Sequence, residues 1–334
     1  MESVDWQALI RLRRLFIEGP AAQVPYWRDE TDVRSYDLTF AQRIGWKWDF
    51  VLGELRRLGW TPPAGVVVDW GCGSGIAGRA YVGAFGLERV QRLHCVDCSP
   101  VAVEYALRRA REKHPGMEVA AGLPERVDVL LISHVLSELS QETVAQLLEL
   151  CRRATCVLWV EPGDYPSSLS LIAIRERLRG ELHPVAPCPH RERCGILEPE
   201  NEPHWCHHFA PVPGFVFHDP DWGRFAHEME IDLRSLPVSF LVLDRRPAPP
   251  LPEGTVRMIG RPRIAKPHAR ILGCRADGRL FEGWVMRRRL PEVYRFLRKE
   301  RPPSLQHWEC DGEEILAWGP WGTEAGGRPE ATGR

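Results

Sequence analysis

The chain has 334 residues, of which 44% are hydrophobic and 27% are charged, and its formal net charge is −1. This composition is typical of an ordinary globular protein with enough residues for one large domain or two modest ones. A net charge near zero excludes a global field that would drive the protein onto nucleic acid or membrane. No apolar run reaches the roughly 18 residues of a membrane span, and the first residues do not read as a secretory signal. We therefore expect a cytoplasmic protein without a membrane partner.

Residues 1–60 are predicted to form an N-terminal helical segment, because apolar residues recur at helical spacing in 6–16 and 40–58. From there the pattern changes to alternating strands and helices. Strands are predicted at residues 66–70, 93–97, 127–133, 156–161 and 239–244, and helices at residues 101–113 and 141–152. This alternation predicts an α/β fold, a doubly wound sheet covered on both faces, within residues 61–245.

A glycine-rich turn follows the first predicted strand, with Asp69 at the end of the strand and Gly71, Gly73 and Gly75 after it. Glycine lets the backbone approach a ligand without a Cβ in the way. Asp97 ends the next strand, where a carboxylate can accept hydrogen bonds from both hydroxyls of a ribose. The D-x-G-x-G-x-G spacing differs from that of dinucleotide and P-loop sites. An acid at the start of the loop suits a cationic, phosphate-free ligand such as S-adenosylmethionine; the alternative is a glycine turn that only joins strand to helix.

Ser133 and His134 follow a later strand, at the edge of the sheet where the cofactor loop is expected. One interpretation places them on the wall of the cofactor or substrate cavity. The other has His134 capping the next helix, whose start is predicted at residues 137–139. The sequence identifies no catalytic group.

Residues 184–220 lack periodicity and are rich in Pro, Cys and His, and we interpret them as a Cys-rich insert kept in order by a metal centre. Cys188, Cys194 and Cys206 lie within it, and Cys274 follows a later strand from which it could supply a fourth ligand. Four thiolates suit tetrahedral zinc or an iron–sulfur cluster, and the absence of paired C-x2-C motifs favours [4Fe–4S]. The alternative treats these cysteines as small buried hydrophobic residues. Other candidate ligands are His190, His204, His207 and His208.

Residues 246–320 are predicted to form a basic, β-rich C-terminal extension, followed by a disordered tail at residues 321–334. Between residues 245 and 301 there are sixteen Lys or Arg and five Asp or Glu. The basic residues alternate with Trp284, Tyr294 and Phe296, whose rings could stack on RNA bases. The alternative is a solvated basic surface.

Together these motifs resemble those of the methyltransferase-like proteins of small-ribosomal-subunit assembly, found in bacteria and in mitochondria. The resemblance runs from about Trp46 to Trp308. Its motifs are residues 69–75, 133–139 (SHVLSEL), 161–163 (EPG), 188–190 (CPH), Cys194, 205–209 (WCHHF), 236–245 (LPVSFLVLDR) and 261–274. Two departures are the added histidine in WCHHF and the GRPRIAKPH segment, which replaces an RPP-type basic run.

The resemblance implies a class I methyltransferase fold, a four-cysteine [4Fe–4S] site, and association with small-subunit ribosomal RNA. The leading hypothesis is an S-adenosylmethionine-dependent methyltransferase acting on that RNA. The residues expected to bind the cofactor are Asp69, Gly71, Gly73, Gly75, Asp97, Ser133 and His134. The alternatives are a non-catalytic assembly factor that binds RNA and a small-molecule methyltransferase with a structural zinc. The sequence does not predict the oligomeric state.

Overall fold

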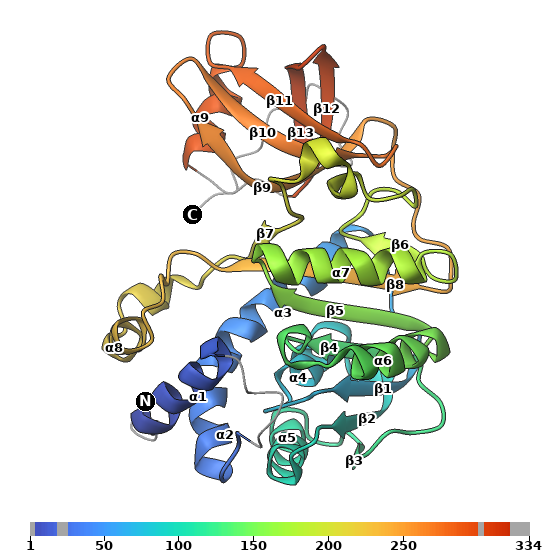
Figure 1. The fold of residues 1–334 in the computed structure, drawn as a ribbon, viewed down its shortest axis with the longest axis vertical. Helices are drawn as coiled ribbons and strands as arrows, with labels where there is room; N and C mark the ends of the chain where they lie inside the picture. Colours follow the sequence, from blue (N-terminus) through green and yellow to red (C-terminus); the bar gives the residue numbers. More distant parts are fainter. Residues whose placement is uncertain (1–3, 19–25, 300–303, 321–334) are drawn as a thin grey trace.

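The computed structural model describes residues 4–18, 26–299 and 304–320, so the predicted disordered tail lies outside the described residues. A sheet with helices on both faces occupies one part of the molecule, and a barrel of strands lies at the other end (Figure 1). None of the helices that the structure describes has both the length and the apolar character needed to cross a membrane.

The larger sheet has the order β3-β2-β1-β4-β5-β8-β6, and a short strand, β7, pairs with one end of β8. The strands are β1 (Gly65–Trp70), β2 (Val90–Val96), β3 (Val119–Ala121), β4 (Val129–Ser133), β5 (Cys156–Pro162), β6 (His183–Ala186), β7 (His208–Phe209) and β8 (Pro237–Asp244). Strands β1 to β5 are parallel, whereas β8 runs antiparallel to both β5 and β6. The predicted doubly wound sheet is confirmed, and its order with a reversed β8 is of the class I methyltransferase type.

Nine α-helices lie within the described ranges. They are α1 (Trp6–Glu18), α2 (Glu30–Asp37), α3 (Phe40–Arg57), α4 (Ile76–Phe85), α5 (Pro100–Lys113), α6 (Gln141–Arg153), α7 (Tyr165–Leu178), α8 (Pro220–Glu228) and α9 (Pro291–Lys299). Short 3-10 turns are η1 (Leu87–Arg89), η2 (Leu136–Glu138), η3 (Gly195–Leu197), η4 (Pro199–Asn201) and η5 (Gly214–Phe217). Helix α6 confirms the prediction at residues 141–152, and Ser140 caps it by accepting from the Thr143 amide; residues 137–139, which were expected to begin it, lie instead in and just after the 3-10 turn η2. The prediction that His134 caps that helix is therefore wrong.

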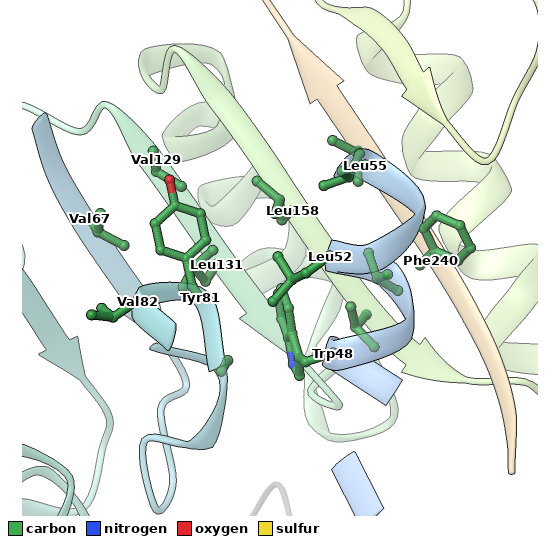
Figure 2. Close-up of a cluster of buried hydrophobic side chains, with 14 of the residues drawn as sticks. Trp48, Leu52, Leu55, Val67, Tyr81, Val82, Val129, Leu131, Leu158 and Phe240 are labelled. Carbon is green, nitrogen blue, oxygen red and sulfur yellow. The ribbon is translucent and has the colours of Figure 1, made fainter. Parts of the chain in front are cut away.

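Helices cover both faces of the sheet, and this explains the continuous apolar runs of its strands. On one face, Trp48, Leu52 and Leu55 of α3 are buried against the strands that carry Leu131 and Leu158 (Figure 2). Helices α4 and α5 contribute to the same core. Helices α6 and α7 pack on the opposite face, where they bury a separate set of leucines and isoleucines.

The C-terminal strands close into a barrel of order β10-β11-β13-β12-β9, and closure removes free sheet edges. They are β9 (Thr255–Ile264), β10 (His268–Arg275), β11 (Leu280–Met286), β12 (Leu305–Asp311) and β13 (Glu314–Pro320). Alternate residues of these strands, among them Val256, Ile271, Val285 and Trp308, fill the interior together with Leu297 of α9. The barrel has a hydrophobic core of its own, and Leu305 at the start of β12 packs instead in the core of the α/β sheet.

A buried ionic group joins the barrel to α3. Arg257 of β9 is 2% exposed; its Nη1 donates to Ser304 Oγ at 2.7 Å and contacts the carboxylate of Glu54. Its Nε donates to the carbonyl of Pro187 at 2.8 Å. Burial alone would raise the pKa of Glu54, but Arg257, Arg57 and the Ser304 hydroxyl outweigh it and hold that pKa below its ordinary value. The barrel, α3 and the chain before Cys188 therefore meet at one guanidinium.

Candidate functional site

A cavity of about 890 Å³ opens at the carboxyl ends of β1, β2 and β4, the place where doubly wound sheets bind ligands. Five of the seven residues predicted to bind the cofactor line it. They are Gly71, Gly73, Asp97, Ser133 and His134. The other two, Asp69 and Gly75, lie behind the glycine loop and do not line the cavity.

The glycine loop presents bare backbone to this cavity. Gly71 has a φ of 66°, and a Cβ at this position would lie 2.7 Å from Val135 Cγ1, so only glycine fits. A Cβ on Gly73 would meet no atom within 4 Å, because this residue faces open space. Asp97 fixes the loop: Oδ2 accepts from the Gly73 amide at 2.9 Å, and Oδ1 accepts from the Ser99 amide at 2.9 Å. The loop therefore forms a cradle of bare backbone, and side chains at the glycine positions would occupy the space that a ligand needs.

Asp69 supports the loop from behind. It is fully buried, and its Oδ2 accepts from the amide of Gly78 at 2.8 Å. Its Oδ1 has no hydrogen-bond partner among the described residues. Burial raises the pKa of this carboxyl to about 7, against the Gly78 hydrogen bond and the charge of Arg79. The bare backbone of Gly71 and Gly73 and the carboxylate of Asp97 line the cavity and fit a cofactor with a ribose, while Asp69 supports the loop from behind.

Lys47 was not identified from the sequence, yet it lines the cavity beside His134. Its Nζ lies 2.9 Å from His134 Nε2, and His134 has a φ of 55°, which is rare for residues other than glycine. Ser133 Oγ lies 3.3 Å from His134 Nδ1 and accepts from Trp48 Nε1 at 3.0 Å. Burial lowers the pKa of Lys47 to about 7, with Arg43 adding to the effect and Glu161 and Asp164 opposing it. A neutral amine is therefore available in the cavity near neutral pH.

Aromatic residues of the N-terminal helices and the segment between them form another wall of the cavity, which the prediction of a helical segment did not anticipate. Tyr26, Trp27, Tyr36 and Phe40 line it. Tyr26 Oη donates to Glu138 Oε2 at 3.3 Å. Burial raises the pKa of Glu138 to about 7, and the negative charge of Asp97 acts in the same direction. The cavity thus combines flat apolar rings, which suit a base, with acidic groups at the ends of the strands.

The four predicted metal ligands lie in one region, between α7, β8 and the barrel. Each of the four thiols is within electrostatic range of the other three. Cys188, Cys194 and Cys206 line a cavity of about 30 Å³, and Cys194, Cys206 and Cys274 share an apolar cluster with Ile172 of α7. Burial raises the pKa of Cys194 to about 11, and it also raises the pKa values of Cys206 and Cys274 well above their ordinary value. Sulfurs from segments far apart in the sequence therefore converge.

Arg175 of α7 holds this region together. It is 2% exposed, and its Nε donates to Cys188 Sγ at 3.1 Å. Its Nη2 donates to the carbonyls of His190 at 3.1 Å and Glu192 at 2.9 Å. Ser168, earlier on the same helix, donates to the carbonyl of Cys206 at 2.9 Å. The charge of Arg175 opposes the effect of burial on the pKa of Cys194, Cys206 and Cys274.

Two histidines of this insert, His190 and His208, lie near the cysteines. His208 Nε2 lies 3.9 Å from Cys206 Sγ, and neither ring nitrogen of the buried His190 has a hydrogen-bond partner among the described residues. Within the described chain, no group of three or more His, Cys, Asp or Glu side chains is arranged to hold a single metal ion.

The rings predicted to stack on RNA bases are placed differently. Tyr294 is 6% exposed, belongs to the barrel core and donates its hydroxyl to the carbonyl of Ala265 at 2.7 Å. The expectation that it stacks on bases is wrong, because α9 is amphipathic and turns this ring inward. Trp284 and Phe296 are half-buried.

The strand order and the cavity at the carboxyl ends of the strands define a class I methyltransferase-like protein. A family model described as mitochondrial small ribosomal subunit Rsm22 matches residues 56–302, and the chain belongs to this family. A search of curated proteins gave no match.

One similar solved structure is PH1948 of Pyrococcus horikoshii, to which an RNA methyltransferase activity has been ascribed. Its sequence is 14% identical to this chain and the TM-score is 0.38; the match covers 59% of this chain and 83% of PH1948. The precorrin-6y C5,15-methyltransferase of Geobacter metallireducens is 12% identical with a TM-score of 0.35, covering 57% and 84%. TrmK of M. capricolum, in complex with S-adenosyl-homocysteine, is 8% identical with a TM-score of 0.32, covering 58% and 69%. All three scores lie below 0.5, and the fold assignment rests on the strand order.

Proposed function

We propose that the protein binds S-adenosylmethionine and transfers its methyl group to small-subunit ribosomal RNA. The observation that carries the proposal is the glycine cradle beside Asp97, with the unpaired Oδ1 of Asp69 behind it. The residues that would bind the cofactor are Gly71, Gly73 and Asp97 at the loop, with Ser133 and His134 on the facing wall. Asp69 and Gly75 would act by shaping the loop. The family description, which names the mitochondrial small ribosomal subunit, supports RNA of that particle as the substrate.

The bound cofactor supplies an activated methyl group, so the protein needs to align a nucleophile with it and to remove a proton. Lys47 is the group we assign to the second task. The contact of 2.9 Å between Lys47 Nζ and His134 Nε2 would orient the amine, and in the tautomer in which Nε2 accepts, the neutral amine keeps its lone pair for a proton of the nucleophile. The aromatic wall of Tyr26, Trp27, Tyr36 and Phe40 would exclude water from a base held there.

We further propose that Cys188, Cys194, Cys206 and Cys274 bind a [4Fe–4S] cluster with a structural role. The convergence of the four sulfurs and the buried Arg175 support it, because a cationic donor offsets the charge of thiolate ligands. Zinc bound by the same four cysteines is the alternative. Iron and zinc contents of protein purified without oxygen separate the two, since a zinc-loaded, iron-free protein contradicts the cluster.

The test of the methyltransferase is labelled S-adenosylmethionine with deproteinised small-subunit RNA as acceptor. We expect label in the RNA with the wild-type protein. Asp97→Ala should bind the cofactor at least about tenfold more weakly, a loss of about 1.4 kcal/mol, without unfolding. Tight cofactor binding without any labelled RNA would replace this proposal with a non-catalytic assembly factor. Native cofactor affinity in Asp97→Ala would contradict the cavity assignment.

A further inference from the structure

A second cavity, of about 520 Å³, lies at one end of the barrel, between α9 and the ends of strands β10 and β11. We infer that this cavity is a binding site for the phosphate backbone of RNA. Four of its lining side chains are arginines and none is acidic. The arginines are Arg287, Arg288, Arg295 and Arg298. The other residues that line the cavity are Pro267, Met286, Pro291 and Tyr294. The inference rests on the proposed function in that it takes RNA to be the partner.

The fold holds these arginines on a rigid frame. Tyr294 and Leu297 anchor α9 in the barrel core, so Arg295 and Arg298 of the same helix are exposed on its other side. The Arg287 amide donates to the Pro267 carbonyl at 3.0 Å and joins the end of β11 to the turn between β9 and β10. Both walls of the cavity therefore belong to fixed elements. Little order has to be gained when a ligand binds.

The charge of the cavity is poorly compensated. Arg295 lies 3.3 Å from Glu292, but these side chains are 59% and 77% exposed, and such pairs contribute little. Arg287, Arg288 and Arg298 have no ion pair with any residue that the structure describes. Arg287 lies over the ring of Tyr294 at 5.8 Å, which keeps its guanidinium at the cavity. Four guanidinium groups around one space repel each other, and an anion between them relieves the repulsion.

The observations favour RNA over an acidic peptide. A guanidinium group presents two parallel N–H donors that match a phosphate. Beyond the cavity, Arg263, Lys266 and Arg270 are exposed on β9, β10 and the turn between them; one carboxylate, that of Glu282, lies 3.9 Å from Arg263 and 3.6 Å from Arg270, so the face keeps a net positive charge. An extended polyanion with regularly spaced charges fits such a face better than a short acidic segment does.

The position of this second cavity suits a site that holds RNA on the protein without presenting it to the cofactor. The barrel and α9 lie at one end of the molecule, whereas α1 and α2, which contribute to the wall of the cofactor cavity, lie at the other (Figure 1). RNA bound at the barrel is therefore far from the glycine loop. Its affinity should not depend on the cofactor.

The test compares Arg288→Glu/Arg298→Glu with wild type in binding a fluorescent fragment of small-subunit ribosomal RNA, by anisotropy at several salt concentrations. Both residues are exposed, so the variant should fold and bind S-adenosylmethionine normally. We expect RNA affinity to fall at least about tenfold and the slope of log affinity against log salt to become shallower by about 1 to 2. The matched control is Arg111→Glu/Arg177→Glu, which makes the same charge change on α5 and α7 and should lose much less affinity.

Equal losses in the two double variants, or no loss in either, would overturn the inference, since net charge rather than this cavity would then govern binding. Wild-type protein that binds polyglutamate through Arg288 and Arg298 but fails to bind the RNA would assign the cavity to an acidic protein instead. Cofactor binding and RNA labelling are measured separately. Their failure would refute the methyltransferase while leaving the RNA result standing.

Discussion

Lys47 and His134 show how a pair of side chains 87 positions apart creates a group that titrates near neutral pH. Burial moves the pKa of Lys47 from 10.5 down to about 7. The neutral amine therefore predominates above pH 7, and the ammonium form predominates below it. If Lys47 accepts the proton in methyl transfer, the rate at saturating cofactor should rise with pH through about 7 and then level off.

Replacing Lys47 with Met keeps the length of the side chain and removes the amine. We expect methyl transfer to slow by about 100-fold or more, which is the usual contribution of a general base, while the dissociation constant of the cofactor changes little. Single-turnover labelling and calorimetry measure the two quantities. A loss of cofactor affinity with an unchanged transfer rate would mean that the amine binds the cofactor instead.

The sequence predicted the cavity residues at the strand ends, but not the side chains from other elements that complete the cavity. Gly71, Gly73 and Asp97 follow apolar runs, and parallel strands bring such ends to one edge. Lys47 had no comparable signal, because it is one polar residue among several on an amphipathic helix. Tyr294 was misjudged for a related reason: a composition rich in arginine and aromatic residues does not say which side of α9 faces the barrel.

At the scale of elements, the segment after β6 depends on side-chain contacts more than on regular structure. Between Cys188 and His208 it contains only 3-10 turns, and its backbone is held by Arg175 and Ser168 of α7. Short turns bury little apolar surface and so provide little stability of their own. The order of this segment therefore depends on whatever its sulfurs bind.

We expect Cys188→Ser and Cys206→Ser to lose the bound iron and to be cleaved by protease within residues 184–220 at least about tenfold faster than wild type. Cys310→Ser is the matched control, since that thiol lies on β12, outside this group, and should leave both properties unchanged. Iron content and limited proteolysis are the measurements. Wild-type iron content in both variants would remove these residues from the ligand set.

The strands and helices of the sheet were predictable because apolar runs and glycine turns are local signals. The closure of β9 to β13 into a barrel was not predicted, because it depends on pairings between distant strands, such as β9 with β12, that alternation within one strand does not specify. The helix predicted at residues 141–152 is α6, which Ser140 caps, whereas residues 136–138 form a separate 3-10 turn and do not begin that helix.

At the scale of the whole molecule, Arg257 and Glu54 connect two cores that are distant in the sequence. Removing one member of a buried ion pair leaves the other charge without compensation. Glu54→Ala should therefore lower the free energy of unfolding by about 3–5 kcal/mol, whereas Glu54→Met together with Arg257→Met should lower it much less. Urea denaturation followed by tryptophan fluorescence measures both, and equal losses in the two variants would contradict the assignment.

The pKa of Glu54 gives this connection a pH dependence. Because the pKa is held below its ordinary value in the folded protein, the stabilisation is present above about pH 4.5 and is lost as pH falls through the lower, folded-state value. No local pattern in the sequence pairs residues 203 positions apart. The two-part organisation could be anticipated from composition, but the contact that unites the parts could not.

Helix α7 reaches both of the sites proposed for this protein. Pro166 and Ser167 in its first turn line the cofactor cavity, and Ser168 and Arg175 hold the backbone around the converging sulfurs. A ligand that displaces or stiffens this helix at one end changes the free energy of binding at the other, and linkage makes the effect mutual. Titrating the cofactor into protein with and without its inorganic centre measures this coupling, which would make each ligand a regulator of the other.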